Sequence, residues 1–460
     1  MEIYLKGKNI DLYSNLLMVL LCVLMADCAV FGAGRTIMIG SLGFRMVLVG
    51  ITMLLSVPWL INKIPEFLKN RYLWILAAFA VWLAVETVIG IARGNTRAIL
   101  ASDLKGFTYF AMVLPILCVL NTRKRVEMLM KVIMYAVAVL AVVSIFLMFL
   151  HNWKYEWYVS FYMWDIEHNI TMFASVTKTI LRAFYKSTPY LLCGCAFSTY
   201  FYVQEQSGKR TWIYPAICGL SLFALLVSYT RSVYLAVAVA AVFLLILFAC
   251  VAKKSRKAII RFLAASILIF LAVLILCSVL LRVNCFAYAL DRLLGTFGVT
   301  VMEGTDDFPN VEEETQGGLT ENIAVFQEAT KESDEVRKAT LEELWENIEA
   351  SPIIGHGLGK SLAVRDHGPS EYVYHDICMK TGIVGLVLLF AAAVLMVLQL
   401  FWEIRSGAAE TALLYTAWLS VLLGFMTFSY FNPYMNASLG ILFYCCCIGI
   451  FSINKEALLK

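Results

Sequence analysis

Three of the five histidines fall in one stretch late in the chain, SPIIGHGLGKSLAVRDHGPSEYVYHDICMKTGIVGL, which runs from Ser351 to Leu386. Histidine has an ordinary pKa of about 6.5, so it can take up or release a proton near neutral pH. His375 stands where the polar part of this stretch turns into an apolar run. This position predicts a histidine at a membrane surface, at the mouth of a space between helices. There it acts either as a general base or as the partner in a local hydrogen bond.

Four cations form a second set of residues that could do chemistry. Arg231 lies in a turn of a few residues between two apolar runs, and Arg45, Lys105 and Arg182 stand at or just before the start of other apolar runs. An arginine side chain is always charged and offers a planar fork of donors that suits phosphate oxygens. Together these cations predict a site for a polyanion such as a lipid pyrophosphate. Singly, each could also extend its charge toward lipid headgroups.

The composition identifies the class of protein that must position these residues. Of the 460 residues, 61% are hydrophobic and 15% are charged, and the mean hydropathy is +0.78. Soluble domains have roughly 45–50% apolar and 25% charged residues. Apolar windows of about 20 residues, long enough to cross a bilayer as a helix, recur along the chain. The sequence therefore predicts an all-α polytopic membrane protein.

The apolar windows number about twelve, and the lysines and arginines of the short loops predict their orientation. The expected spans are 12–31, 42–61, 72–91, 104–120, 127–150, 188–204, 212–229, 233–251, 258–281, 377–401, 409–429 and 437–453. Basic residues favour the cytoplasmic side, and here they recur in every second loop and at both termini. Both termini are therefore expected in the cytoplasm, and all five histidines on the outer face.

One large outer loop is expected between the ninth and tenth spans. It divides the chain into spans 1–9 (residues 1–282), the loop (283–376) and spans 10–12 (377–460). Residues 283–374 carry 18 of the 33 acidic residues and only six lysines and arginines. A connection of this length is typically a folded or binding element. A start signal at Ser333 or Asp334, apolar spacing from Val336 to Ile348, and Pro352 beyond predict one helix in it.

These residues resemble the O-antigen ligase and polymerase superfamily, the WaaL and Wzy-type proteins. The resemblance rests on the outer turn YTRS, which contains Arg231, on the long late loop, and on the order Arg, Trp, SPIIGHGLG, His, GIVGL. The family's loop histidine corresponds to His375, its turn arginine to Arg231 and its loop arginine to Arg337. The stretch LRAFYKSTPYLL also matches the family and adds Arg182. Asp376 and Thr230 replace the asparagine and serine that often flank the family's histidine and arginine.

The resemblance implies a membrane glycosyltransferase that needs no metal or other cofactor and uses a sugar chain on undecaprenyl pyrophosphate as the donor. His375 would act as general base on the acceptor hydroxyl. The five cations Arg231, Arg337, Arg182, Arg45 and Lys105 would hold the pyrophosphate and stabilise it as it leaves. The spacing of the late histidines is unlike that of zinc ligands, so no metal site is expected.

Three functions are consistent with this pattern. We expect a polymerase that extends a bacterial surface polysaccharide, such as an O-antigen or capsule, by transfer to another lipid-linked repeat unit. A ligase that transfers the glycan to a lipid A core is the alternative, and a flippase or transporter of polyprenyl-linked lipids is a third interpretation. The expected partners are the undecaprenyl-pyrophosphate-linked oligosaccharide and membrane lipids, with no nucleic acid, and a chain-length regulator protein could be a further one. The expected location is the bacterial cytoplasmic (inner) membrane, with the large loop outside.

Overall fold

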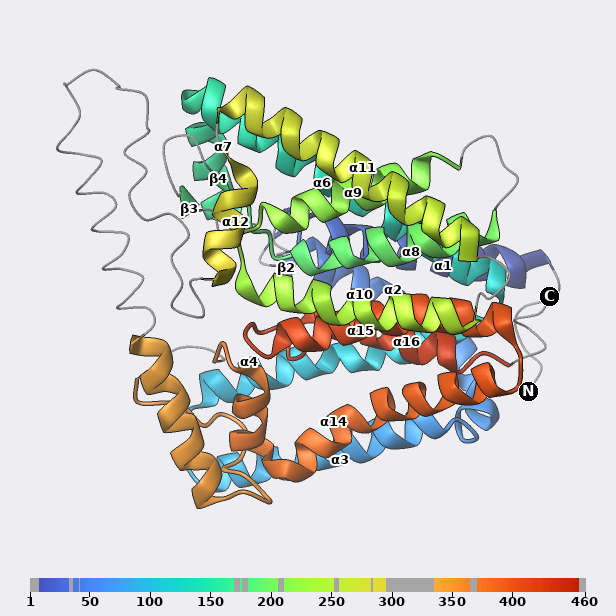
Figure 1. Cartoon of the computed structure of the whole chain (residues 1–460). Coiled ribbons are helices and arrows are strands. Elements are labelled where there is room, and N and C mark those ends of the chain that lie inside the picture. The colour runs from blue at the N-terminus through green and yellow to red at the C-terminus, as the bar shows by residue number, and fades with distance from the viewer. Residues whose placement is uncertain are drawn as a thin grey trace.

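The protein is a bundle of long helices, as seen in a computed structural model of the chain (Figure 1). The structure describes residues 8–32, 36–40, 42–168, 174–175, 181–205, 211–251, 256–282, 284–294, 335–364 and 370–454. Helices account for nearly all of this, and the strands form two hairpins of two-residue strands. The predicted all-α polytopic membrane fold is confirmed.

The elements follow one another along the chain with short connections. They are α1 (Lys8–Val30), β1 (Met38–Ile39), β2 (Leu42–Gly43), α2 (Phe44–Phe67), α3 (Arg71–Ala92), α4 (Arg97–Thr108), the 3₁₀ turn η1 (Tyr109–Met112), α5 (Val113–Val119), α6 (Arg123–Trp153), α7 (Tyr155–His168), β3 (Ala174–Ser175), β4 (Leu181–Arg182), η2 (Thr188–Tyr190), α8 (Leu191–Gln204), α9 (Ile213–Leu226), α10 (Arg231–Val251), α11 (Arg256–Leu281), α12 (Cys285–Leu294), a helix over residues 335–350, α14 (Val373–Arg405), α15 (Ala409–Ser429) and α16 (Ser438–Phe451).

Within the described residues, nine helical segments are long and apolar enough to cross a bilayer. The segments predicted as spans 188–204, 212–229 and 437–453 form the helices α8, α9 and α16, each of 14 residues. At 1.5 Å per residue such a helix covers only about 21 Å of a hydrocarbon core of about 30 Å. Every predicted span corresponds to a helix, but the count of twelve crossings stays a prediction.

The short helix α16 lies at the centre of the bundle. All of its residues except Ser438 are buried, among them the run Cys445–Cys447. The ring of Phe443 in α16 stacks on Phe425 in α15, with 4.9 Å between ring centroids. A helix that is apolar on all sides is either buried among other helices or spans a membrane, and the burial of α16 shows that other helices surround it. Helix α16, which follows the loop from α15, is therefore held firmly by its neighbours.

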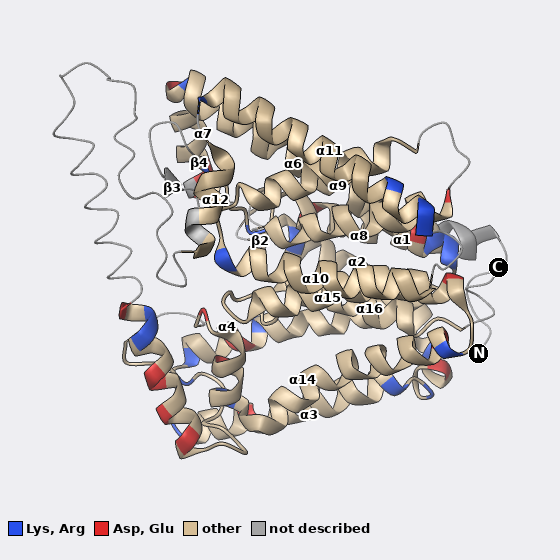
Figure 2. Ribbon diagram, in the orientation of Figure 1, with Lys and Arg blue, Asp and Glu red and all other residues tan. Residues whose placement is uncertain are grey.

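The charged residues gather at the two ends of the bundle, and the middle of the helices has few of them (Figure 2). Helix α1 begins and α16 ends at the same end of the bundle (Figure 1). The basic starts of α3 and α6 also lie at this end: Arg71 donates to Gln399 near the end of α14, and Arg123 contacts Glu410 at the start of α15. The other end holds the start of α14, the start of α4 and the helix over residues 335–350 (Figure 1).

The helix predicted within the late loop is confirmed over residues 335–350, and it ends before Pro352 as expected. Its apolar face packs through Leu344 and Ile348 onto Met379 of α14. The acidic stretch EGTDDFPNVEEETQGG, within 295–334, lies outside the described residues. Helix α14 begins at Val373, earlier than the predicted 377, so His375 lies in its first turn rather than in a loop.

Candidate functional site

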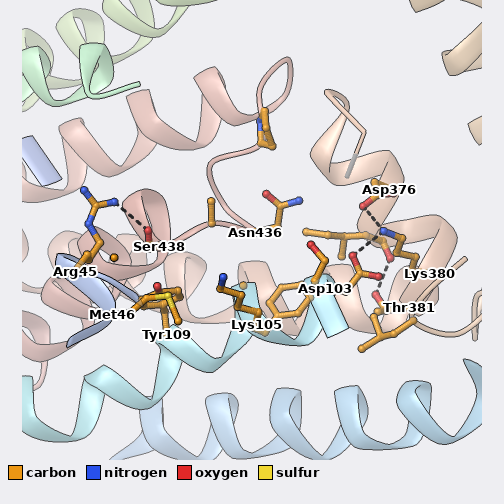
Figure 3. Close-up of a pocket in the computed structure, with 18 of the residues that line it drawn as sticks. Arg45, Met46, Asp103, Lys105, Tyr109, Asp376, Lys380, Thr381, Asn436 and Ser438 are labelled. Atoms are coloured by element: carbon orange, nitrogen blue, oxygen red, sulfur yellow. Dashed lines mark hydrogen bonds and ion pairs between the residues drawn. The ribbon is translucent and has the colours of Figure 1, made fainter. Parts of the chain in front are cut away.

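A polar cavity of about 680 Å³ opens at the end of the bundle that holds the start of α14 (Figure 3). Its walls come from the starts of α2 and α14, from α4, and from the loop that joins α15 to α16. Five charged side chains line it: Arg45, Asp103, Lys105, Asp376 and Lys380. Two of the predicted cations are therefore in one space, together with the residue that follows His375.

Arg45 is a buried structural residue at one end of the cavity. Its side chain is 2% exposed and forms an ion pair of 2.8 Å with Asp27 of α1. It also donates to the carbonyl of Gly32 at 2.9 Å and to the hydroxyl of Ser438 at 3.1 Å. These bonds tie α2 to α1 and to the start of α16. Because Asp27 offsets its charge, Arg45 contributes little net positive charge to the cavity.

Lys105 is different, because its ammonium group points into the cavity between Arg45 and Asp103 (Figure 3). No carboxylate of the described residues lies within 4.0 Å of it. The sequence predicted that Lys105 opens a span, but α4 begins at Arg97 and Lys105 lies in its last turn. Thr96 precedes the helix in an extended conformation without a side-chain capping bond, and the polar turns 97–105 are themselves helical.

A buried group of three charges forms the opposite end of the cavity (Figure 3). The ammonium of Lys380 lies 2.9 Å from Asp103 and 2.9 Å from Asp376, and its side chain is 3% exposed. The second oxygen of Asp103 accepts the backbone N–H of Gly359 at 3.0 Å. Sequence reasoning missed this group. The available signal was the spacing Asp376 to Lys380, an ion-pairing distance of four residues inside an apolar helix.

The glycine-rich turn GHGLG is a structural element that presses against α3. Gly355, Gly357 and Gly359 all have φ between +82° and +84°, a region that favours glycine. A Cβ atom on Gly357 would overlap the backbone of Gly90 in α3. The amide of Asn95 donates to three consecutive carbonyls of this turn at 3.0–3.2 Å. The turn is therefore built for close packing, and it delivers the N–H of Gly359 to Asp103.

His375 lies in a box of aromatic rings in the first turn of α14. Its ring meets those of Trp345, Tyr430 and Tyr372 edge-on, with centroids 5.2, 5.4 and 6.0 Å away. The residue is 9% exposed, and its buried Nδ1 has no hydrogen-bond partner in the described part of the chain. The rings fix the plane of the imidazole while its nitrogens stay available for a proton.

An apolar groove of about 560 Å³ runs along the outside of α10, α14 and α15, next to His375. Tyr374 and Tyr430 line the groove beside His375, and aliphatic side chains such as Leu235, Val239 and Val394 line the rest of it. Leu235 and Val239 lie four and eight residues after Arg231, so all three share one face of α10. Arg231, which is exposed, therefore lies one helical turn before Leu235 on this face, just outside the residues that line the groove.

Arg182 supports the turn that presents Arg231. Its guanidinium donates to the carbonyl of Ser228 at 3.3 Å and to the hydroxyl of Thr230 at 3.1 Å. Both of these partners are neutral oxygens. Tyr229, between them, has φ of +44°, a strained value for a bulky residue. The structure thus brings Arg182 to the turn of Arg231, and neither residue lines the polar cavity.

The loop between α15 and α16 connects the two places. Asn432 donates to the hydroxyl of Ser232, beside Arg231, at 3.0 Å. Four residues later, Asn436 lines the polar cavity, and its backbone lies so close to Gly106 of α4 that a Cβ there would overlap it. This loop is not recognisable as part of a site from the sequence, because its stretch SYFNPYMNAS contains no ionisable group other than tyrosine.

The remaining predicted residues lie elsewhere. Arg337 is on the outer side of the helix over residues 335–350, is 51% exposed and pairs with Glu371 at 3.1 Å, so it does not line the cavity. His356 holds the glycine turn, with Nε2 at 2.7 Å from the carbonyl of Asn347. His367 lies outside the described residues. The five predicted cations therefore occupy three places rather than one.

Comparison with known families gives one match. Residues 216–390 match a family described as O-antigen ligase. This segment runs from α9 into α14 and contains Arg231, Trp345, His375, Asp376 and Lys380. No curated protein shows a significant match to the chain. Over residues 216–390 the chain is thus similar to the O-antigen ligase family, and the predicted resemblance to the O-antigen ligase and polymerase superfamily is confirmed.

Proposed function

We propose that this protein is a glycosyltransferase that moves a glycan from undecaprenyl pyrophosphate to the hydroxyl of an acceptor sugar during assembly of a bacterial surface polysaccharide. The match to the O-antigen ligase family supports a transferase of this type acting on lipid-linked substrates. The nine helical segments that are long and apolar enough to cross a bilayer support a site reached from within the membrane.

The observation that carries the proposal is that Arg231 begins α10 one helical turn before Leu235, which lines the apolar groove. A polyprenyl pyrophosphate has a long apolar chain that ends in a compact double anion. The groove offers apolar side chains for the first part, and Arg231 offers a forked cation for the second. The N-terminus of α10, at Arg231, adds the positive end of a helix dipole. Arg182 holds the turn and adds a second charge beside it.

His375 is suitably placed for the proton transfer. Tyr374 before it lines the groove, and Asp376 after it lines the polar cavity. In the proposed step the acceptor hydroxyl attacks C1 of the donor sugar and a new C1–O bond forms. The bond from C1 to the phosphate oxygen breaks, and undecaprenyl pyrophosphate leaves with the electron pair, stabilised by Arg231 and Arg182. His375 accepts the hydroxyl proton, and a single displacement inverts the anomeric carbon.

The identity of the acceptor distinguishes a polymerase from a ligase. We propose a polymerase, in which the acceptor is another lipid-linked repeat unit. The helix over residues 335–350, next to His375, exposes four glutamates, among them Glu346 and Glu349, and only two basic side chains. The glutamates would repel a phosphorylated lipid A core, the acceptor of the alternative ligase reaction. A chain-length regulator protein is a further partner that a polymerase of this type could have.

The proposal also specifies an orientation. The end of the bundle with the basic starts of α3 and α6 would face the bacterial cytoplasm. The polar cavity, Arg231 and His375 would then face the outside of the cytoplasmic membrane, where the lipid-linked sugars are joined. A reporter fused after Phe451 and tested for cytoplasmic activity checks this orientation, and a periplasmic signal from it would contradict it.

The function is tested in a strain that lacks the gene, by gel electrophoresis of its surface and lipid-linked polysaccharide. A polymerase predicts that the deletion leaves single repeat units and that the intact gene restores a ladder. A deletion that leaves long polymer on the lipid carrier would instead favour the ligase. A deletion with a normal surface polysaccharide would contradict both.

A further inference from the structure

We infer that the polar cavity lined by Asp103, Lys105, Asp376 and Lys380 is a saccharide-binding site that holds the acceptor sugar. The inference rests on the proposed function, because it assigns the second substrate of that reaction to a separate space. It also gives Lys105 a role that differs from the pyrophosphate binding expected from the sequence.

The charges at the two ends of the cavity do not suit a pyrophosphate, which leaves Lys105 between them as a single cation for it. Arg45 is already paired with Asp27 at 2.8 Å. At the other end two carboxylates, Asp103 and Asp376, share the single ammonium of Lys380, so this end is net negative. A double anion there would meet like charges in a partly desolvated space, which is unfavourable. A neutral ligand with many hydroxyl groups meets no such barrier.

The geometry of the three charges suits hydroxyl groups. Two carboxylates this close to each other would normally repel, and Lys380 holds both at 2.9 Å. The N–H of Gly359 fixes the second oxygen of Asp103. An ionised carboxylate only accepts hydrogen bonds and has about four acceptor positions. Asp103 and Asp376 therefore keep acceptor positions for sugar O–H groups, and Lys380 is a positioning residue for both.

The rest of the cavity wall offers the complementary groups. Lys105 points its ammonium into the space, where it can donate to sugar oxygens (Figure 3). The side-chain oxygen of Asn436 is buried without a hydrogen-bond partner in the described part of the chain. Apolar side chains such as Met46 and Phe107 complete the wall. A few fixed donors and acceptors among apolar surfaces are what orient a small polar ligand.

The location of the cavity suits an acceptor. Its wall at Asp376 directly follows His375, and the apolar groove lies on the other side of this turn, at Tyr374. A sugar in the cavity would present a hydroxyl to His375 from the side opposite the donor lipid. The volume of about 680 Å³ has room for a short oligosaccharide.

The test uses a photoreactive amino acid, p-benzoylphenylalanine, in place of Leu42 at the mouth of the cavity or of Val394 in the groove. Both side chains are exposed and line only their own space. The full-length protein is irradiated in the membranes of cells that accumulate a lipid-linked repeat unit labelled in its sugars. Mild acid then cleaves the bond between sugar and phosphate. A cross-link to the sugar keeps the label on the protein, and a cross-link to the lipid loses it.

We expect the probe at Leu42 to keep the sugar label after acid and the probe at Val394 to lose it. Lys105→Gln should lower the labelling from Leu42 about tenfold, the usual effect of losing a charged hydrogen bond, and leave that from Val394 unchanged. Lys380→Met should also lower the labelling from Leu42 if the variant folds. If it does not fold, Lys105→Gln alone tests the saccharide site.

Labelling from Val394 without any acid-stable labelling from Leu42 would overturn the saccharide site and leave the proposed function intact. Labelling from Leu42 that Lys105→Gln does not reduce would also overturn the assignment of Lys105. An absence of labelling from both positions, in a protein that fails to restore the polysaccharide, would instead overturn the proposed function.

Discussion

Tyr374 and Asp376, two residues apart at the start of α14, face two different spaces: Tyr374 lines the apolar groove and Asp376 lines the polar cavity. The reason is the helix itself, since two residues correspond to a rotation of about 200°. His375 lies between them, in the turn that separates the two spaces. This relationship underlies the proposal that a donor lipid and an acceptor sugar meet at one histidine.

The role of Arg231 is tested by two substitutions. Arg231→Ala should abolish polysaccharide transfer, because the leaving pyrophosphate loses its forked donor. Arg231→Lys should be nearly as inactive, because a lysine offers a point charge in place of two parallel donors. Arg231 is exposed, so both variants should keep the thermal unfolding temperature of the wild type to within a few degrees.

Arg256 provides the matched control for this pair. It is also an exposed arginine in the first turn of a helix, but it lies at the start of α11, away from the groove. Arg256→Ala should retain full polysaccharide synthesis at equal membrane expression. Activity of Arg231→Lys equal to that of the wild type would mean that charge alone suffices there.

The buried pair of Arg45 and Asp27 is expected to govern stability. Asp27→Leu leaves a buried guanidinium without its carboxylate and should lower the free energy of unfolding by about 3–5 kcal/mol. The double variant Asp27→Leu with Arg45→Met removes both charges and should regain much of this loss. Thermal unfolding of the purified proteins in one detergent measures both. A double variant that is no more stable than the single one would show that the pair does not act as a unit.

Gly382 tests the docking of the glycine turn onto α14. It kinks α14 with φ of +64° and ψ of −177°, a region essentially restricted to glycine. A Cβ there would also overlap the carbonyl of Ile353. Gly382→Ala should therefore destabilise the protein by about 2–5 kcal/mol, as measured by thermal unfolding.

Gly407 is the control for that substitution. Its φ is +77°, but nothing lies within 4 Å of a Cβ built on it. Gly407→Ala should cost only the backbone strain, about 1–2 kcal/mol. Equal losses for the two variants would contradict the close contact between the turn and the kink.

The sequence was sufficient to predict the membrane class and the helices, because both depend on local patterns. Apolar windows identified every long helix, and the helix in the late loop was predicted from its start signal at Ser333 or Asp334 and its apolar spacing. The number of crossings is harder to predict, because hydropathy does not separate a short central helix such as α16 from a full span. Both are apolar on every side.

The site was only partly predictable, because it depends on contacts between distant segments. Arg45 was predicted to bind a ligand, but its charge is offset by Asp27. Asp27 is 18 residues away in the sequence, so the pairing was not evident from a local pattern. Asp103 and Lys380 are separated by 277 residues, so no local sequence pattern predicts that they form an ion pair. Arg182 and Arg231 were both predicted, and the structure joins them through the turn at Thr230.

The role of His375 in glycan transfer is tested most directly by a gel of surface polysaccharide. A strain lacking the gene is rescued with the wild type, with His375→Ala, or with His168→Ala, a half-buried histidine whose Nδ1 lies 2.7 Å from the carbonyl of Trp164 in its own helix. All three proteins are compared at equal membrane levels. We expect a full ladder from the wild type and His168→Ala and single repeat units from His375→Ala. A full ladder from His375→Ala would contradict this expectation and make His375 a structural residue of the aromatic box.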